Sequence, residues 1–380
     1  MIKNDIAIIG LGITSKLAAL TLASENCKVL ILGQENPKPY DSNLVTFLSL
    51  NSIEFLKSIG VKTLIDESVP INEISCSKLE NYQSSNKFQI NFKDKKEMGR
   101  VVPNSNLSES LDNQIKINEN INILNNIKIK NFKNEEANKS LLLDNGEEVF
   151  FNLLLVSDKK SHLINENFKR NIIKKDLSQT SIVMNVSTKT NNHAYQFFTK
   201  KGALAFLPIN KDSASIIWSL DNNSVELEYD IKEISEVLNK IFKQITNSIS
   251  VIDLQKYKLN FEYAKKITHN SIVLIGDAAH SLHPIAGQGL NLSIKDIIEL
   301  KNKINHYKYL GYKLGNSISL DEYEDVRQVD NTVYTFATNY LDKVFKSRNY
   351  IVNTISNLGI ANIERNNTLK NIIIKSATGQ

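Results

Sequence analysis

The chain has 380 residues, of which 41% are hydrophobic and 23% charged, and its formal net charge is +5. This composition is ordinary for a globular protein, and the length allows one large α/β domain that carries a second lobe. No basic block with interleaved aromatic residues is present, so nucleic acid is not the expected partner, whereas the mild positive charge permits a weak attraction to an anionic membrane surface.

The two cysteines, Cys27 and Cys76, have no metal-like spacing and are too few for a disulfide framework. Cys27 is expected to be a buried structural thiol. The sequence starts without the basic-then-apolar pattern of a signal peptide, and no apolar run approaches the ~20 residues that cross a bilayer. We therefore expect a protein of a reducing compartment, cytoplasmic and either soluble or peripheral at the inner membrane.

The first elements form a βαβ unit. Ile6–Ile9 is a short apolar strand of the kind found when helices cover both faces of a sheet. It runs into Gly10-Leu11-Gly12, a helical segment over Ile13–Ala23 and a second strand over Val29–Leu32. A short helix is expected over Ser52–Gly60, with the glycine at its end.

The rest of the chain alternates between sheet-like and helical segments. In chain order we expect a sheet-like stretch over 79–95, a helix over 104–111, a strand over 153–156, several strands over 181–220, a helix over 233–245, a strand over 272–275, and mostly helix after Gly289. No internal repeat occurs. The second lobe is therefore expected to be inserted into the first and not appended to it.

These patterns predict an α/β protein with a Rossmann-like βαβ domain, an interleaved mixed-sheet substrate domain and a helical C-terminal region. The expected bounds are 1–75, 96–160 and 269–330 for the nucleotide-binding domain, 76–95 and 161–268 for the substrate domain, and 331–380 for the helical region.

The opening glycines form a phosphate-binding turn. Gly10 permits the tight turn, and Gly12 lets backbone N–H groups approach a pyrophosphate at the helix N-terminus. Ser15 stands at the third glycine position of the fingerprint. Gly33 stands where an acidic residue would hold a ribose, and Glu35 is the nearest acidic substitute. An ordinary strand–turn–helix is the alternative interpretation of this motif.

A second and more specific motif runs from Gly276 to Asn291. A buried strand delivers Asp277 to the carboxyl edge of the sheet, where its carboxylate can accept hydrogen bonds from ribityl hydroxyls. The glycines after it let a loop lie flat against a planar ring, and the following helix N-terminus would stabilise negative charge on a reduced flavin. The expected cofactor contacts in this motif are Gly276, Asp277, Pro284, Gly287, Gly289, Leu290 and Asn291.

This run resembles the signature of the ubiquinone-biosynthesis hydroxylases, a family of FAD-dependent aromatic monooxygenases. The resemblance covers nearly the whole chain. Its other landmarks are the segment 98–104 with Leu107 and Leu111, the segments 176–179 and 194–199, and the strand 202–208 with Trp218. It implies FAD as the cofactor, with Asn104 and Asp158 among its contacts.

The chain departs from the family pattern at several positions. Ser293 replaces a glycine, the middle Asp-Gly motif survives only as Asp158-Lys159, and the arginine usual near residues 41–46 is missing. In the family the middle motif is associated with the pyrophosphate and with pyridine-nucleotide reduction. Of the steps in the reaction, the reduction of FAD by NADPH is therefore the one that these substitutions are expected to impair.

The resemblance implies hydroxylation of the aromatic ring of a polyprenylated phenol on the route to ubiquinone. NADPH or NADH reduces FAD, O2 gives a flavin hydroperoxide, and the ring attacks it in a pocket that excludes water. The pocket candidates are Pro284, Ala205, Leu207 and Trp218, and no metal or catalytic dyad is expected. A further hypothesis is that the protein contacts the membrane through its helical, basic C-terminal region (Lys370 and Lys375) and associates with a biosynthetic complex.

Alternatives stay open at this point. The chain could be a monooxygenase of another hydrophobic substrate, or a non-catalytic flavoprotein accessory of the complex. His280 and His283 could serve acid–base or metal chemistry, although structural places near the flavin are the preferred interpretation. Asp158 could be a turn residue, and Arg100 either a surface charge or a cofactor contact.

Overall fold

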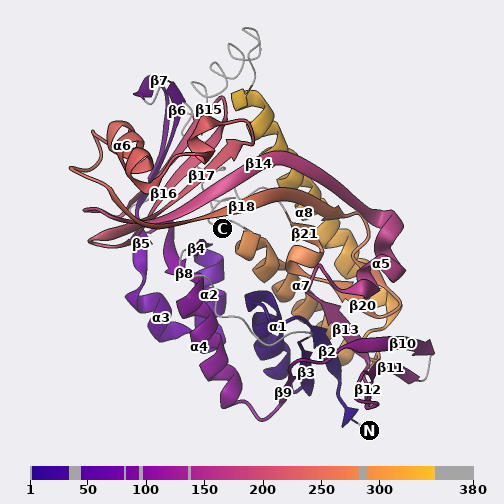
Figure 1. The fold of residues 1–380 in the computed structure, drawn as a ribbon. Helices are drawn as coiled ribbons and strands as arrows, with labels where there is room; N and C mark the ends of the chain where they lie inside the picture. The colour runs from indigo at the N-terminus through magenta and orange to yellow at the C-terminus, as the bar shows by residue number, and fades with distance from the viewer. Residues whose placement is uncertain are drawn as a thin grey trace.

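The computed structural model describes residues 2–33, 44–80, 83–93, 97–135, 138–281 and 289–346. Figure 1 shows a nucleotide-binding half that contains the N-terminus and a half built on a broad, strongly curved sheet. Segments from distant parts of the sequence contribute to both halves, as the interleaved arrangement predicted.

A six-stranded, mostly parallel sheet forms the centre of the nucleotide-binding half. Its central strand, β2, has two strands on either side that run parallel to it. The edge strand β19 pairs antiparallel with β20. In sheet order the strands are β19 (Thr268–His269), β20 (Ile272–Leu274), β13 (Leu153–Val156), β2 (Ile6–Ile9), β3 (Val29–Leu32) and β9 (Ile121–Leu124).

Helices bury this sheet, which explains its uninterrupted apolar strands. Every residue of β2, β3, β13 and β20 is buried. The helices of this half are α1 (Ile13–Ala23), α2 (Leu50–Ser58), α3 (Lys62–Glu67), α4 (Asn104–Lys116), α5 (His162–Phe168) and α7 (Gly289–Tyr309), and α8 (Ser317–Lys346) begins here. Helix α5 lies in the segment expected to belong to the substrate domain, yet its Leu163, Ile164 and Phe168 pack into the core of the nucleotide-binding half.

The second half is an eight-stranded mixed sheet. All its pairs are antiparallel except β15–β6, which joins two segments far apart in the sequence. In order the strands are β21 (His280–Ser281), β18 (Ser250–Ala264), β14 (Ile172–Ser187), β17 (Ser213–Asp221), β16 (Gly202–Asn210), β15 (His193–Thr199), β6 (Glu73–Glu80) and β7 (Gln83–Lys93). Helix α6 (Ile231–Ile241) packs on one face of it.

Two small sheets were not predicted. The first consists of β4 (Val45–Ser49), β8 (Gly99–Pro103) and β5 (Val69–Ile71), and the second of β1 (Ile2–Lys3), β12 (Glu148–Phe150), β11 (Asn138–Leu143) and β10 (Ile129–Glu135). Three short 3-10 helices, Lys169–Asn171, Val225–Leu227 and Gly276–Ala278, complete the elements of the described residues. Short strands such as these form only against a distant partner, so local patterning indicates them poorly.

Three helix and strand boundaries differ from the predicted ones, because helix capping or strand pairing sets them. The helix expected from Ser52 begins at Leu50, because the Ser49 side chain accepts a hydrogen bond from the backbone N–H of Ser52. Helix α6 begins at Ile231, since Asp230 and Glu233 form a capping box. Strand β14 starts at Ile172 and not near 181, because β18 pairs with its whole length across a bulge.

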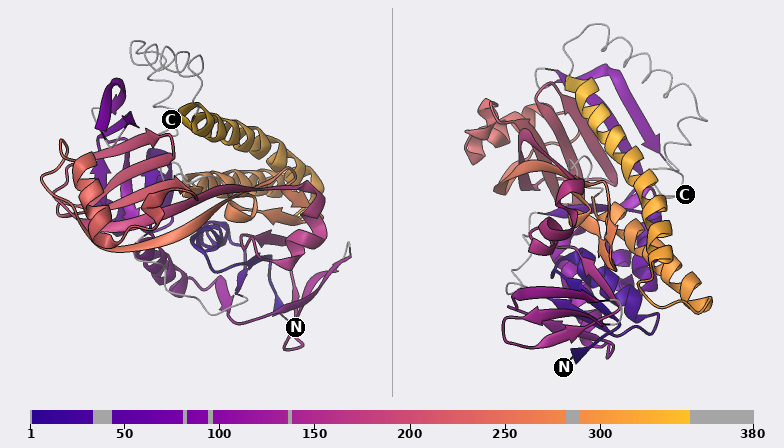
Figure 2. Two further views of the ribbon diagram at one scale, coloured as in Figure 1. Left: turned by 45° about the horizontal axis from the view of Figure 1, so that its top comes forward. Right: turned by 90° about the vertical axis from the view of Figure 1, so that its right-hand side faces the viewer.

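Helix α8 spans the two halves. It leaves the turn after α7 on the nucleotide-binding side and runs past the edge of the large sheet, as the right-hand view of Figure 2 shows. It packs on α7 and also contacts β15 and β19. None of the helices within the described ranges is both long and apolar enough to cross a bilayer.

Candidate functional site

Three loops meet at the carboxyl edge of the parallel sheet. They follow the adjacent strands β2, β13 and β20 and begin at Gly10, Ser157 and Ile275. Gly10 has φ +122°, and a Cβ added there would lie 2.5 Å from Ser157 Oγ. Only glycine therefore fits at this crossing of two loops. In open α/β sheets, ligands bind in a crevice at this edge.

Helix α1 begins at this edge of the sheet. Gly12 is its N-cap, with no side-chain hydrogen bond to the first turn and no acidic residue in that turn. Backbone N–H groups and the helix dipole there suit a pyrophosphate. Ser15, at the third position of the fingerprint, is fully buried and its hydroxyl faces that of Ser157. Serine thus replaces the usual glycine without disturbing the helix–strand packing.

The end of β3 differs from the usual ribose site. A Cβ added to Gly33 would lie 2.3 Å from Leu11 Cδ1, so Leu11 fills the direction in which an acidic side chain would project. An acidic residue at position 33 would clash with Leu11. The suggested substitute, Glu35, lies outside the described residues.

The second motif packs closely on the first. Gly276 has φ +58°, and a Cβ added there would lie 2.8 Å from Thr14 Cγ2 and 3.1 Å from Ser293 Oγ. The serine that departs from the family pattern is accommodated because it packs against a glycine. Asp277 follows on the 3-10 helix with an exposed side chain, which leaves its carboxylate accessible to a ligand. The glycine turn and this carboxylate fit the ribityl and phosphate portion of FAD.

The structure describes the second motif up to Ser281 and again from Gly289. Pro284, Gly287 and the neighbouring His283 lie outside the described residues, as do Lys370 and Lys375. Gly289 and Leu290 form the first turn of α7. A Cβ on Gly289 would meet nothing within 4 Å, so this glycine faces open space.

The side chain of Asn291 makes three hydrogen bonds within the protein. Its Oδ1 accepts hydrogen bonds from the Ser49 N–H at 2.9 Å and the Ser52 hydroxyl at 2.7 Å, and its Nδ2 donates to Phe47 O at 2.7 Å. Asn291 therefore fixes the start of α7 to β4 and α2.

Asn104 and Asp158 take local roles. Asn104 Oδ1 accepts a hydrogen bond from the Thr46 hydroxyl at 2.7 Å, which joins α4 to β4. Asp158 Oδ1 accepts one from the Lys160 N–H at 2.9 Å, as a turn residue does. The exposed Lys159 reaches toward Ser281 Oγ, at 3.4 Å. Both Asp158 and Ser281 adjoin the crevice.

Arg100 is a structural residue. Its Nη1 donates to the carbonyl oxygens of Ile65, Asp66 and Ser68, and Glu97 pairs with the guanidinium at 2.8 Å. These contacts hold α3 against β8 and leave little of the guanidinium for a cofactor.

The prediction that Trp218 lines the same pocket as Ala205 and Leu207 is wrong. Ala205 and Leu207 point to the face that packs against Val45 and Phe47. Trp218 is buried on the other face, in the cluster that α6 covers. Neighbouring positions on paired strands alternate between faces, and Trp218 stands opposite Leu204 in the register.

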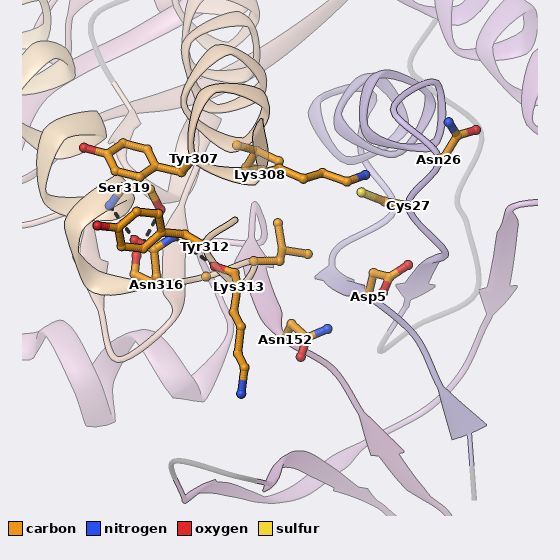
Figure 3. A pocket seen from close by; sticks show the side chains of 13 residues that line it. Asp5, Asn26, Cys27, Asn152, Tyr307, Lys308, Tyr312, Lys313, Asn316 and Ser319 are labelled. Atoms are coloured by element: carbon orange, nitrogen blue, oxygen red, sulfur yellow. Dashed lines mark hydrogen bonds between the residues drawn. The ribbon is translucent and has the colours of Figure 1, made fainter. Parts of the chain in front are cut away.

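A cavity of about 360 Å³ lies away from this site (Figure 3). Its lining includes Asp5, Cys27 and Asn152, which precede β2, β3 and β13 and so mark the amino edge of the sheet. Lys308, near the end of α7, extends toward Cys27 in Figure 3, and Tyr312, in the turn after α7, lines the same cavity. The cofactor loops lie at the opposite edge. Cys27 is buried, as predicted.

Comparisons with known proteins bear on the cofactor. The family model described as "FAD binding domain" matches residues 161–329. Ubiquinone hydroxylase UbiL from Rhodospirillum rubrum is 24% identical, over 99% of this chain and 89% of the relative. The chain is similar to the FAD-dependent ubiquinone hydroxylases over nearly its whole length. FAD is thus the cofactor that the crevice accommodates.

Another curated relative and a solved structure are also similar over nearly the whole chain. The 3-demethoxyubiquinol 3-hydroxylase of Escherichia coli is 22% identical, over 99% of this chain and 98% of the relative. Among solved structures, the p-nitrophenol 4-monooxygenase PnpA of Pseudomonas putida superposes with a TM-score of 0.79 at 16% identity, over 99% of this chain and 98% of that one. This similarity confirms the predicted α/β fold class.

Proposed function

We propose that this protein is an FAD-dependent monooxygenase that hydroxylates the aromatic ring of a polyprenylated phenol in ubiquinone biosynthesis. The observation that carries the proposal is the convergence of the Gly10, Ser157 and Gly276 loops at one sheet edge. The curated relatives named as ubiquinone hydroxylases and monooxygenases support the reaction and the substrate class.

An apolar surface adjoins the proposed flavin site. Phe47, whose carbonyl accepts the hydrogen bond from Asn291, also packs with Ala205 and Leu207 of the large sheet. We infer that this face, together with Pro284, bounds the ring of the substrate. The apolar side chains of this face suit a reaction in which water must be excluded.

The residues of the chain bind and orient, and the cofactor supplies the redox chemistry. When bound and reduced by NADPH or NADH, FAD supplies the activation of O2. Gly10, Gly12 and the first turn of α1 would hold its pyrophosphate, and Asp277 its ribityl hydroxyls. Ser15, Glu35, Asn104, Asp158, Gly287, Gly289 and Leu290 remain proposed neighbours.

The absorption spectrum of the purified protein tests this proposal. We expect bound oxidised flavin that bleaches when NADPH is added anaerobically, and a hydroxylated prenylphenol when the gene is expressed in a ubiquinone-deficient host. Protein without flavin would refute the cofactor assignment. Bound flavin that NAD(P)H does not reduce would favour the alternative of a non-catalytic accessory protein. A different product would show that the substrate does not belong to ubiquinone biosynthesis.

We also propose a peripheral, cytoplasmic location at the inner membrane and contact with a biosynthetic complex. A polyprenyl tail partitions into the bilayer, so its hydroxylase must reach the membrane surface. Flotation with liposomes measures this directly. Absence of binding in every lipid mixture would contradict membrane contact without affecting the assignment of the reaction.

A further inference from the structure

A buried ionic cluster lies behind the flavin turn. It consists of Asp296 on α7, Arg327 on α8 and His280 at the start of β21, which are 0%, 2% and 2% exposed. We call these three residues the Asp296 cluster. Burying charges costs free energy unless each is paired and hydrogen-bonded, so a cluster of this kind needs a reason.

One oxygen of Asp296 holds both ends of the turn. Asp296 Oδ2 lies 2.6 Å from His280 Nε2 and accepts a hydrogen bond from the Gly276 N–H at 3.2 Å. The chain between these two residues contains Asp277, the proposed ribityl ligand. A single carboxylate oxygen therefore fixes the conformation of the segment Gly276–His280.

The other oxygen connects this turn to α8. Asp296 Oδ1 accepts a hydrogen bond from Arg327 Nε at 2.8 Å. The guanidinium is itself held, because its Nη1 donates to Asp330 at 2.6 Å and its Nη2 to Asn331 at 3.1 Å. Arginine suits this place since its planar group can serve three acceptors at once.

A second contact joins the same two segments. His280 pairs with Tyr263 in the ladder between β21 and β18, and the Tyr263 hydroxyl donates to Gln328 Oε1 of α8 at 2.5 Å. Helix α8 thus braces the turn twice, once from Arg327 and once through Tyr263. Neither residue needs to contact the cofactor for this effect.

We propose that Asp296 and Arg327 are positioning residues that hold the Gly276–His280 turn in the conformation that accepts FAD. The inference rests on the proposed function, in that it takes this turn as part of the FAD site. Through it, α8 becomes part of the cofactor-binding machinery, although its sequence carries no cofactor motif. By analogy, removing the residues that orient metal ligands typically lowers metal affinity by about 10- to 100-fold.

Titration of FAD into apoprotein, followed by quenching of flavin fluorescence, tests the proposal without measuring hydroxylation. We expect Arg327→Met to raise the dissociation constant of FAD about tenfold or more, and Arg327→Lys to recover part of the loss. Glu322→Gln is the matched control, because Glu322 pairs with Lys303 at 3.0 Å and joins the same two helices at the surface. It should leave the dissociation constant within about twofold of native.

Thermal unfolding of the apoproteins separates positioning from general stability. Equal FAD affinity in native protein, Arg327→Met and Glu322→Gln would overturn the inference while leaving the FAD assignment intact. Native protein that binds no FAD would overturn both. If Arg327→Met does not fold, Arg327→Lys alone decides: weaker FAD binding at an unchanged apoprotein melting temperature supports positioning, and native affinity refutes it.

Discussion

The hydroxyl oxygens of Ser15 and Ser157 lie 2.5 Å apart, although 142 residues separate them in the chain. Ser15 belongs to α1 and Ser157 to the loop after β13, so this contact joins two walls of the cofactor crevice. Ser157 Oγ also lies 3.3 Å from the Ile9 carbonyl oxygen. Ser15, which replaces a glycine of the fingerprint, therefore links α1 to the loop after β13.

Replacing Ser15 with alanine should destabilise the protein by about 1 kcal/mol, the usual net contribution of one buried hydrogen bond. FAD affinity should fall modestly, since the loop at Ser157 loses one anchor. Urea unfolding and FAD titration measure the two effects. Thr180→Ala is a suitable control, because it breaks an exposed pair with Asn222. An S15A protein as stable as native would contradict this role.

Substituting Gly276 with alanine should abolish tight FAD binding. The residue has φ +58°, and the new Cβ would lie 2.8 Å from Thr14 Cγ2, so both strain and a clash arise. Gly146→Ala separates the two causes, because Gly146 has φ +86° with nothing within 4 Å. We expect G146A to cost only the conformational penalty of about 1 kcal/mol. Equal losses of stability and equal FAD binding in the two variants would refute the close-packing argument.

Asn291→Ala removes three buried hydrogen bonds that join α7 to β4 and α2. Because partners are left unsatisfied, the free energy of unfolding should fall by about 3 kcal/mol or more. FAD binding should weaken as well. Asn239→Ala is the comparison, since Asn239 bonds Ser235 and Ile249 in the other half of the molecule. That variant should lose stability but retain FAD affinity when folded; equal FAD affinity in both would contradict the prediction.

The Asp296 cluster should make stability depend on pH. Burial alone would lower the pKa of His280, but the adjacent Asp296 carboxylate outweighs it and raises the pKa above 6.5, against the opposing charge of Arg327 and with help from Asp277. A raised pKa means that the folded state binds the proton more tightly. The stabilisation is complete below pH 6.5 and is lost as pH rises through the folded value.

Unfolding free energies measured from pH 6 upward check this dependence. His280→Gln should remove the decline that sets in above pH 6.5, because the amide does not titrate. His193 and His269 do not interfere, since burial lowers the pKa of both and their effects fall below pH 6.5. Parallel curves for native protein and H280Q would refute the assignment.

Sequence by itself determined the elements whose signals are local. The buried strand Ile6–Ile9, the glycine turn, α1 and the motif at Gly276 were identified because a parallel sheet needs continuous apolar strands and a phosphate turn needs glycine. The run from Gly276 to Asn291 also carries the family resemblance, and it is this resemblance that implies FAD.

Only the tertiary structure decided which side chains meet. The sequence pattern could not predict that Trp218 lies on the face of the sheet covered by α6. That face is set by the register between β17 and β16, which pairs Trp218 with Leu204. It could not reveal that Asn291 is held by Ser49 and Phe47, or that Arg327 reaches Asp296. Asp296 carries no signal beyond its buried position on α7. Contacts between residues distant in the chain arise from packing, and no local sequence pattern encodes them.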